Sequence, residues 1–412
     1  MRILSGRVAQ RAANRMATRG ATPSAIEPLV RRIIRDIRRD GDRALRRYAL
    51  RWDGLEKNQS IRVSDTKMEA AAHFLTPQLR KSLRQAAANI RRFCEWQKPA
   101  EWTRHRNGIS LGQLVRPLES VGCYVPGGRY PLISTLLMTV IPAQVAGVKN
   151  IRVVSPRPSL EVLGAAAMLG VRDFYRVGGA QAIAALAYGT KSIPCVDKIV
   201  GPGNAYVTAA KKLVSFDCAI DFLAGPTEAV VLSDSGTPAF IAADLVAQGE
   251  HDPDALGAFI TTSRKLAVDV ASEVTKLTRG NKLAWQSLQH GAILLAASRE
   301  QAREWANLLA PEHITVDPGE VPFIHNAGSI FVGDYSPQAA GDYASGPNHV
   351  LPTAGQARFR GGLSVLDFVK IITVQQLSAP GLQSIASTVE CLAHTEGLAG
   401  HAHSIRVRGA HA

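Results

Sequence analysis

A polar cluster closes the apolar stretch between residues 241 and 254, which reads IAADLVAQGEHDPD. The apolar residues around Leu245 predict a packed helix, and Pro253 prevents that helix from continuing. Gln248 and His251 are three residues apart, so on a helix they share one face and can reach a common ion or ligand. The stretch therefore predicts a metal or substrate site, and the alternative is a capped helix with an ordinary, partly exposed histidine.

A second stretch, PEHITV, places Glu312 directly before His313 at the start of an apolar run. A carboxylate beside an imidazole is a suitable acid–base pair near neutral pH. Both side chains can face one pocket only if they lie in the turn before the strand, because adjacent residues of a strand point to opposite faces. The alternative from this pattern alone is a helix-to-strand connector with a surface histidine.

A third stretch, GDYASGPNHVLP, is a loop punctuated by glycine. It contains four polar residues: Asp342, Ser345, Asn348 and His349. Such loops are usually turns, but aspartate, asparagine and histidine together are typical of loops that carry sites. The C-terminal residues add His401, His403 and His411, and nothing local distinguishes a ligand among them from a disordered end.

Strand-like and helix-like segments alternate from Val121 onward, and these are the elements that must position the candidate residues. Apolar strands are expected at residues 151–154, 174–177, 198–200, 257–263 and 292–295, with helices at 134–146, 160–169, 265–277 and 299–309. This alternation is typical of consecutive βα units, whose strand ends form the ligand crevice of an open parallel sheet. The glycine clusters match neither GxGxxG nor GxxxxGKS/T, so no dinucleotide site can be argued from a fingerprint.

The first hundred residues have a mostly helical pattern. Apolar residues at three-to-four spacing, from Ile26 to Ile37, predict a helix that Gly41 ends. Thr76 and Pro77 form a good N-cap and first-turn pair, and they begin a long helix. The N-terminal part of the chain is therefore expected to be a helical region that precedes the βα units.

Three segments are expected to lie outside the cores. The arginine-rich residues 1–23 are interpreted as a mobile or partner-docked arm, and residues 99–114 as a short variable connector. The tail beyond Leu363 is interpreted as rich in helix. It is too short to make its own core, so we expect it to pack on another part of the chain or on another subunit.

The composition is that of a globular protein with a basic surface. The chain has 412 residues, 46% hydrophobic and 20% charged, which is enough for the cores of two or three domains. Lys plus Arg minus Asp plus Glu is 48 − 34 = +14, and many arginines fall between Arg31 and Arg51. A nucleic-acid surface is one interpretation, but the chain lacks a zinc finger, an RNA-binding signature and basic–aromatic interleaving. We favour a solvated helix face or a surface that attracts anionic cofactors.

The cysteines indicate a reducing compartment. There are five, widely scattered and never in a CxxC pair: Cys94, Cys123, Cys195, Cys218 and Cys391. This distribution argues against a disulfide framework and against a cysteine zinc site, and it fits the cytoplasm. No apolar run reaches the length that a transmembrane helix needs.

Eight strings taken together resemble the histidinol dehydrogenase family. In chain order they are YVPGGRYPLISTLLMTVIPAQVAGV, VGGAQAIAALAYGT, VDKIVGPGNAYVTAAKKLV, AGPTE, AQGEHDPDA, PEHITV, GDYASGPNHVLPT and EGLAGH. They occur in the family's order, and the resemblance covers the chain from about Ile33 to the C-terminus. The chain is therefore identified as a member of this family.

The resemblance implies a zinc-dependent enzyme that oxidises L-histidinol to L-histidine in two NAD-linked steps, through a bound aldehyde. It implies four ligands for one zinc ion per subunit: Gln248, His251, Asp342 and His401, the last from the partner chain of a homodimer. One amide, one carboxylate and two imidazoles suit zinc, which accepts nitrogen and oxygen ligands. In the family the metal grips the imidazole and amine of the substrate, so positioning is its main task.

The resemblance also implies the roles of the other candidates. His313 would be the base that removes the hydroxyl proton, and Glu312 would activate water to hydrate the aldehyde. The implied substrate contacts are Thr227, Gln248, His251, His313, Asp342, Glu396 and His401, with His349 as a further candidate. The implied cofactor contacts are Tyr124, Gln181 and Asn204.

The expected fold is α/β, with two Rossmann-like doubly wound modules, one inserted in the other, a helical N-terminal region and a small C-terminal arm. The expected domains are an arm (1–23), a discontinuous substrate and zinc module (24–120 and 229–362), an NAD module (121–228) and a helical arm docked on the partner subunit (363–412). We expect neither nucleic acid nor membrane as a partner. Two other functions stay open: a paralogous NAD-dependent dehydrogenase of another small alcohol, such as a sulfonated diol, and a basic nucleic-acid-binding or regulatory protein that lost the chemistry.

Overall fold

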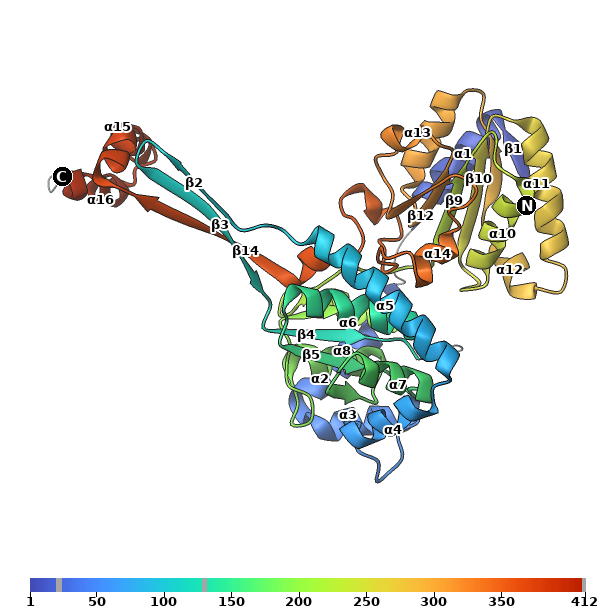
Figure 1. The fold of residues 1–412 in the computed structure, drawn as a ribbon, viewed down its shortest axis with the longest axis horizontal. Helices are drawn as coiled ribbons and strands as arrows, with labels where there is room; N and C mark the ends of the chain where they lie inside the picture. Colours follow the sequence, from blue (N-terminus) through green and yellow to red (C-terminus); the bar gives the residue numbers. More distant parts are fainter. Residues whose placement is uncertain (20–23, 128–131, 410–412) are drawn as a thin grey trace.

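The computed structural model describes residues 1–19, 24–127 and 132–409, which form two parallel α/β units and an extended ribbon (Figure 1). The two units lie beside each other, and the ribbon projects away from them with two helices at its far end (Figure 1). Within the described ranges, none of the helices combines the length and the apolarity that a bilayer crossing requires. The α/β class and the pair of Rossmann-like modules are confirmed.

The first unit is built on a parallel six-stranded sheet with the order β1-β11-β10-β9-β12-β13. Its strands are β1 (Ile3–Ser5), β9 (Glu228–Leu232), β10 (Leu256–Thr261), β11 (Ala292–Leu295), β12 (His313–Val316) and β13 (Ser329–Val332). Its helices are α1 (Gly6–Ala17), α10 (Pro238–Gly249), α11 (Arg264–Leu277), α12 (Lys282–Ser287), α13 (Arg299–Leu309) and α14 (Gln338–Tyr343). Helices α1 and α13 bury their apolar stripes on one face of the sheet, and α10 and α11 cover the other.

The second unit is built on a parallel five-stranded sheet with the order β6-β5-β4-β7-β8. Its strands are β4 (Ser120–Tyr124), β5 (Asn150–Val154), β6 (Asp173–Tyr175), β7 (Lys198–Val200) and β8 (Ala219–Ile220). Helices α6 (Ile133–Ala146) and α7 (Leu160–Met168) cover one face, and α8 (Gly179–Tyr188) and α9 (Ala205–Val214) cover the other. The strand order reverses between β9 and β12 in the six-stranded sheet and between β4 and β7 in the five-stranded sheet, and such points are where doubly wound folds bind ligands.

The helical N-terminal region adds an outer layer to the five-stranded unit. It consists of α2 (Glu27–Asp40), α3 (Asp42–Trp52), α4 (Asp65–Phe74) and α5 (Pro77–Gln97). Helices α2 and α3 pack on α8 and α9, whereas α4 packs on α7 and α5 packs on α6. Short 3-10 helices lie at η1 (Ser24–Ile26), η2 (Val321–Phe323), η3 (Gln356–Arg358) and η4 (Val365–Phe368).

Two of the expected domain boundaries are wrong. The N-terminal residues are not a free arm, because Ile3 pairs with Ile293 at the edge of the six-stranded sheet and Ala9 and Ala13 are fully buried. Residues 24–97 do not join the substrate module, since the apolar stripe that includes Ile33 meets the alanine-rich face of α8. The inserted unit is therefore larger than expected, because it starts soon after α1.

The connector and the tail also differ from expectation, because they form strands. The ribbon has the antiparallel order β14-β3-β2, with β2 (Trp102–Arg106), β3 (Ile109–Pro117) and β14 (Val369–Leu377). It carries α15 (Ala379–Thr395) and α16 (Ala399–Gly409) at its far end (Figure 1). The pairing of β14 with β3 joins residues more than two hundred positions apart, so no local pattern reveals it, whereas β2 and β3 form a local hairpin.

Candidate active site

The three candidate stretches meet at the amino ends of two neighbouring strands of the six-stranded sheet. Thr227 directly precedes β9, and His313 is the first residue of β12, where it pairs with Ala229. Helix α10 follows β9 and returns to this edge, which brings Gln248 to it from the last turn of the helix. Helix α14 brings Asp342 to the same edge.

Short polar contacts join these side chains into one cluster. Glu312 Oε2 accepts hydrogen bonds from Thr227 Oγ1 at 2.6 Å and from the backbone N–H of Glu228 at 3.0 Å. Thr227 Oγ1 also lies 3.2 Å from Gln248 Oε1. On the other side, Gln248 Nε2 donates to Asp342 Oδ2 at 3.2 Å. The hydroxyl of Thr227 has one proton, so we assign it to the shorter bond, the one with Glu312.

The imidazole of His313 lies between two carboxyl groups. Its Nε2 is 3.3 Å from Asp342 Oδ1, and its Nδ1 is 3.7 Å from Glu312 Oε2. Nδ1 is buried and has no hydrogen-bond partner within the described residues. The ring is therefore oriented through Nε2, and Nδ1 is left to exchange a proton with Glu312 or with a ligand.

Burial sets the acid–base properties of this cluster. It raises the pKa of Glu312 to about 7, although the charge of His313 and the bond from Thr227 act in the opposite direction. Burial also disfavours the charged form of His313, but Glu312 and Asp342 outweigh it and the pKa of His313 is raised. A carboxyl group that titrates near neutral pH beside an imidazole can both accept and return a proton.

Gln248 and Asp342 of the cluster line a cleft of about 610 Å³ between the two α/β units, whereas Thr227, Glu312 and His313 are not among its lining residues. One wall consists of Gln248, His251 and Asp342, and Leu83 of α5 and Leu137 of α6 contribute to the other wall. An apolar wall opposite convergent polar groups is the usual composition of a small-molecule site.

Sequence reasoning missed Asp244, which also lines the cleft and whose pKa burial raises to about 6. It lies four residues before Gln248 on the same helix, so the helical spacing of the first stretch could have found it. Glu228 was also missed, although it directly follows Thr227 in the string AGPTE, because its contribution to the site is a backbone N–H.

His349 is partly buried beside Asp342 and is not among the residues that line the cleft. Its Nδ1 is 2.7 Å from the carbonyl oxygen of Asp342, and its Nε2 is 3.4 Å from Thr135 Oγ1. Burial lowers the pKa of His349, which favours the neutral imidazole. The side chain therefore fixes the turn that holds Asp342.

The donors on the cleft wall suit a zinc ion but do not complete a site within one chain. Gln248, His251 and Asp342 offer an amide oxygen, an imidazole and a carboxylate, all of which zinc accepts. Among the residues that the structure describes, no group of three or more His, Cys, Asp and Glu side chains is arranged to hold a metal. The wall contributes one histidine, one aspartate and one amide, so a tetrahedral zinc site would still lack its fourth ligand.

The remaining two candidates, Glu396 and His401, lie away from this cluster. Glu396 caps α15 and His401 lies on α16, at the far end of the ribbon in Figure 1. Both side chains are exposed. The fold of one chain therefore brings Thr227, Gln248, His251, Glu312, His313 and Asp342 together and leaves these two out.

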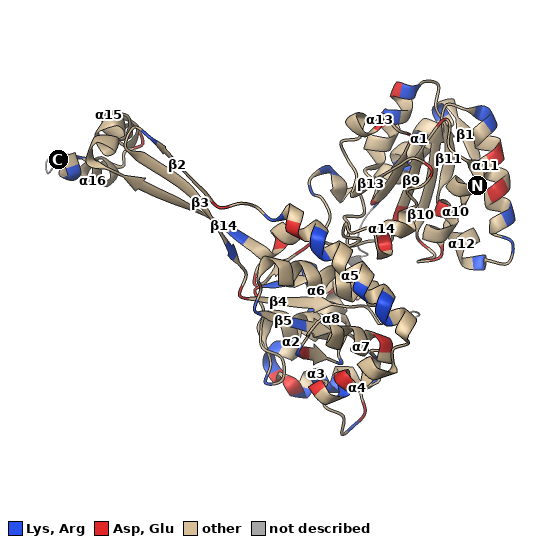
Figure 2. Ribbon diagram, viewed as in Figure 1, with Lys and Arg blue, Asp and Glu red and all other residues tan. Residues whose placement is uncertain are grey.

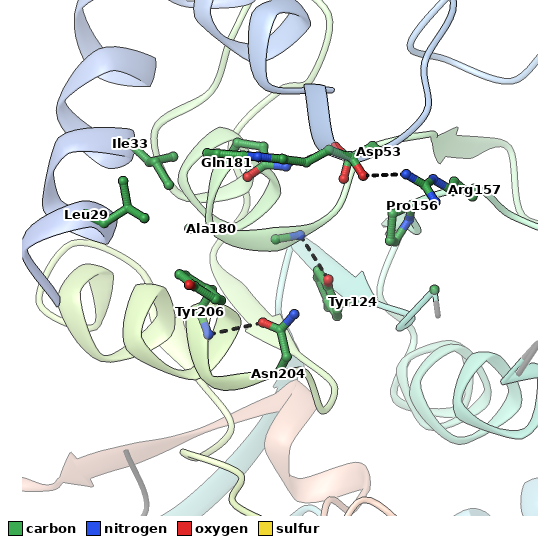
Figure 3. A pocket seen from close by; sticks show the side chains of 13 residues that line it. Leu29, Ile33, Asp53, Tyr124, Pro156, Arg157, Ala180, Gln181, Asn204 and Tyr206 are labelled. Atoms are coloured by element: carbon green, nitrogen blue, oxygen red, sulfur yellow. Dashed lines mark hydrogen bonds between the residues drawn. The ribbon is translucent and has the colours of Figure 1, made fainter. Parts of the chain in front are cut away.

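The three cofactor candidates line a separate pocket of about 600 Å³ on the five-stranded unit (Figure 3). Tyr124 ends β4, Gln181 lies in the first turn of α8, and Asn204 caps the N-terminus of α9. The Tyr124 hydroxyl accepts a hydrogen bond from the backbone N–H of Gly179 at 3.0 Å. The pocket lies at the carboxyl ends of the strands and beside two helix N-termini, an arrangement that favours the phosphates of a dinucleotide.

The corresponding crevice of the six-stranded sheet is filled by its own side chains. Asp234 follows β9 and accepts from Thr262, whereas Asp317 follows β12 and accepts from the backbone N–H of Asp234. Arg299 lies 2.7 Å from Asp234 and 3.2 Å from Asp317. Three charged groups thus occupy the switch point of this sheet, where they oppose the entry of a dinucleotide.

Four of the nine arginines of α2 and α3 lie within ion-pair distance of carboxylates of the same helices. Asp40 lies 2.9 Å from both Arg39 and Arg43, and Asp36 lies 3.0 Å from Arg47. Figure 2 shows blue and red segments interspersed on these helices. The two helices therefore keep a net charge of 9 − 4 = +5 on a solvated surface that mixes both signs.

Comparisons with known proteins give one consistent result. A family model described as histidinol dehydrogenase matches residues 16–409. The chain is 47% identical over 384 residues to a histidinol dehydrogenase of Methanothermobacter thermautotrophicus, covering 89% of the chain and 90% of that protein. It is 45% identical over 383 residues to a histidinol dehydrogenase of Methanosarcina barkeri, covering 89% and 88%. The crystal structure of histidinol dehydrogenase from Elizabethkingia anophelis superposes with a TM-score of 0.95 at 35% identity, covering 99% of this chain and 98% of that one.

Proposed function

The chain belongs to the histidinol dehydrogenase family, and from that premise we propose that it oxidises L-histidinol to L-histidine through bound L-histidinal. The reaction uses two molecules of NAD⁺ and one zinc ion per subunit. The observation that supports it most directly is the hydrogen-bonded cluster of Thr227, Glu312, His313 and Asp342 beside a cleft of substrate size.

In the first oxidation His313 takes the proton of the substrate hydroxyl, while the carbon that bears this hydroxyl transfers a hydride to the nicotinamide. The products are the aldehyde, one NADH and one proton. Asp342 supports this step because its carboxylate orients the ring through Nε2 and stabilises the imidazolium that forms.

In the second oxidation Glu312 takes a proton from water, which adds to the aldehyde carbon. The hydrate then loses hydride to a second NAD⁺ and becomes the carboxylate of histidine. A base for this step must be ionised in part at neutral pH, and the pKa of about 7 for Glu312 meets that requirement.

Zinc would be held by Gln248, His251 and Asp342 with His401 of the partner subunit, and when bound it supplies a Lewis acid that fixes the imidazole and amine of the substrate. The isolated chain supports this division of ligands, because the cleft wall offers three donors whereas His401 belongs to α16, the helix at the far end of the ribbon.

A homodimer with shared sites follows from the same arrangement. The ribbon and its two helices expose a set of large apolar side chains: Trp102, Leu111, Ile371, Ile372, Val374, Leu377, Leu392, Leu398 and Val407. Apolar area of this kind on a projecting element is typical of an obligate interface. We therefore propose that the ribbon packs on a second copy of the chain. The five free cysteines favour a reducing compartment, which supports the cytoplasm as the location of the dimer.

The test follows NADH formation from L-histidinol, with and without a chelator, and counts NADH per histidine formed. The proposal requires two NADH per histidine and a loss of activity on chelation that zinc restores. Absence of turnover with L-histidinol, together with turnover of a sulfonated diol, would show instead a related dehydrogenase on the same fold.

A further inference from the structure

The turn at the end of α3 enters the cofactor pocket from outside the five-stranded sheet. Trp52, Asp53 and Gly54 make this turn, and the first two line the pocket beside Gln181 (Figure 3). Asp53 is only 5% exposed, and none of the proposed catalytic steps or ligand contacts involves it. A buried carboxyl group at a ligand pocket needs a physical reason, because its desolvation is costly.

Two hydrogen bonds converge on one carboxylate oxygen of Asp53. Its Oδ2 accepts from the backbone N–H of Gly178 at 3.1 Å and from Nε2 of Gln181 at 3.0 Å. The first bond fixes the glycine turn that leads into α8, and the second fixes the amide group of Gln181. Gln181 lines the pocket but is only 2% exposed, so packing restricts its side chain. The hydrogen bond to Asp53 fixes the remaining rotation, that of the amide group.

The neighbours of Asp53 hold the turn itself in place. The carbonyl oxygen of Trp52 accepts from Arg157 Nη2 at 3.1 Å, which joins the end of α3 to the loop after β5. Gly54 has a φ of 66°, and a Cβ there would lie 2.8 Å from Arg157 Nε. The turn thus contacts two of the loops that form the pocket, those after β5 and β6.

We propose that Asp53 is a positioning residue for the dinucleotide, which acts by holding the amide of Gln181 and the turn at Gly178 in the geometry that binds the cofactor. The inference rests on the proposed function, since it takes this pocket as the NAD site. It also makes the N-terminal helices part of the cofactor site, because α3 supplies the anchor for a loop of the five-stranded sheet.

Two substitutions separate the hydrogen bonds of Asp53 from its charge. Asp53→Asn can present its amide oxygen at the place of Oδ2, so it retains both acceptor contacts and loses only the charge. Asp53→Ala loses both contacts and leaves two donors unpaired. We expect the KM and Kd for NAD⁺ to rise roughly tenfold or more in Asp53→Ala and much less in Asp53→Asn, with the KM for L-histidinol unchanged.

Asp42→Ala is the matched control. Asp42 begins the same helix and accepts bonds from the backbone N–H of Ser192 at 3.1 Å and from its hydroxyl at 2.5 Å, but it does not line the pocket. The Asp42→Ala variant should lower the stability of the fold as Asp53→Ala does, without raising the KM for NAD⁺. A double-mutant cycle with Gln181→Ala provides the second readout, because the loss from Asp53→Ala should be smaller when Gln181 is already absent, and only the part that acts through the N–H of Gly178 should remain.

Binding of NAD⁺ and NADH, measured by calorimetry on the zinc-loaded dimer, distinguishes the possible outcomes. If the wild-type enzyme binds no dinucleotide, the proposed function fails at its cofactor. If the wild-type enzyme binds and Asp53→Ala binds equally well, the role of Asp53 is refuted. If Asp53→Asn is as impaired as Asp53→Ala, or the effects of Asp53→Ala and Gln181→Ala add, charge or general packing acts there instead and the positioning role is refuted.

Discussion

Replacing Thr227 with valine removes one hydrogen bond from the carboxylate of Glu312 and keeps a branched side chain of similar shape. In the structure Glu312 Oε2 accepts from Thr227 Oγ1 at 2.6 Å and from the Glu228 N–H at 3.0 Å, and the variant retains only the second bond. A hydrogen bond to a charged group contributes about 1.5–3 kcal/mol, and one pKa unit corresponds to about 1.4 kcal/mol. We therefore expect the pKa of Glu312 to rise by roughly 1–2 units from its value of about 7.

The sign of the effect on activity follows from the proposed role of Glu312 as a base. A base must be ionised, so the rate of the second oxidation rises as pH passes upward through this pKa. The acid limb of the kcat profile should move to higher pH by the same amount, and kcat near pH 7 should fall roughly 5- to 50-fold. The rate should recover at a pH well above the new pKa.

The assay measures kcat with L-histidinal, which isolates the second oxidation, between about pH 6 and pH 10. Thr227→Ser is the matched control, because it retains the hydroxyl and should leave the acid limb of the kcat profile at its wild-type pH. The reasoning is refuted if the limb of Thr227→Val does not move, or if that of Thr227→Ser moves equally far.

The remaining predictions concern stability, metal and subunit sharing. Glu312→Gln should raise the free energy of unfolding near pH 8 by on the order of 3 kcal/mol, since burial lifts the pKa of Glu312 from 4.5 to about 7 and the ionised wild-type group destabilises the fold. The difference in the free energy of unfolding between Glu312→Gln and the wild type, measured by denaturant titration, should decrease as pH falls below the pKa of Glu312 and vanish below about pH 4.5. His251→Asn should lose bound zinc and activity together, as metal analysis would record; full activity without metal would exclude His251 as a ligand. Inactive variants of His401 and His313 should regain part of their activity when mixed and allowed to exchange subunits, because one of the two sites in each mixed dimer is intact; no recovery despite exchange contradicts shared sites.

The rule that sites lie at the carboxyl ends of parallel strands located the cofactor pocket but not the cluster around Glu312 and His313. At the five-stranded sheet the rule that strand ends form the crevice holds, and Tyr124 and Asn204 lie there. At the six-stranded sheet that edge is filled by Asp234, Asp317 and Arg299, and the candidate chemistry lies at the opposite, amino edge. The returning helices α10 and α14 decide this, because they bring Gln248 and Asp342 back to the start of the strands.

The sequence by itself determined the α/β class, the alternation of strands and helices, the family and the three stretches that carry the candidate chemistry. These follow from local patterns: apolar periodicity, helix caps, and polar residues at fixed spacing. The sequence also identified Glu312 and His313 as a pair, because they are adjacent in the chain.

Only the tertiary structure decided which distant segments meet. The pairing of Ile3 with Ile293, the ribbon that joins β14 to β3, and the contact of Asp53 with Gln181 each connect residues more than a hundred positions apart. The pKa of Glu312 is likewise a property of the folded state, because burial by distant segments raises it. Contacts of this kind depend on which apolar faces are buried together, and no local spacing records that choice.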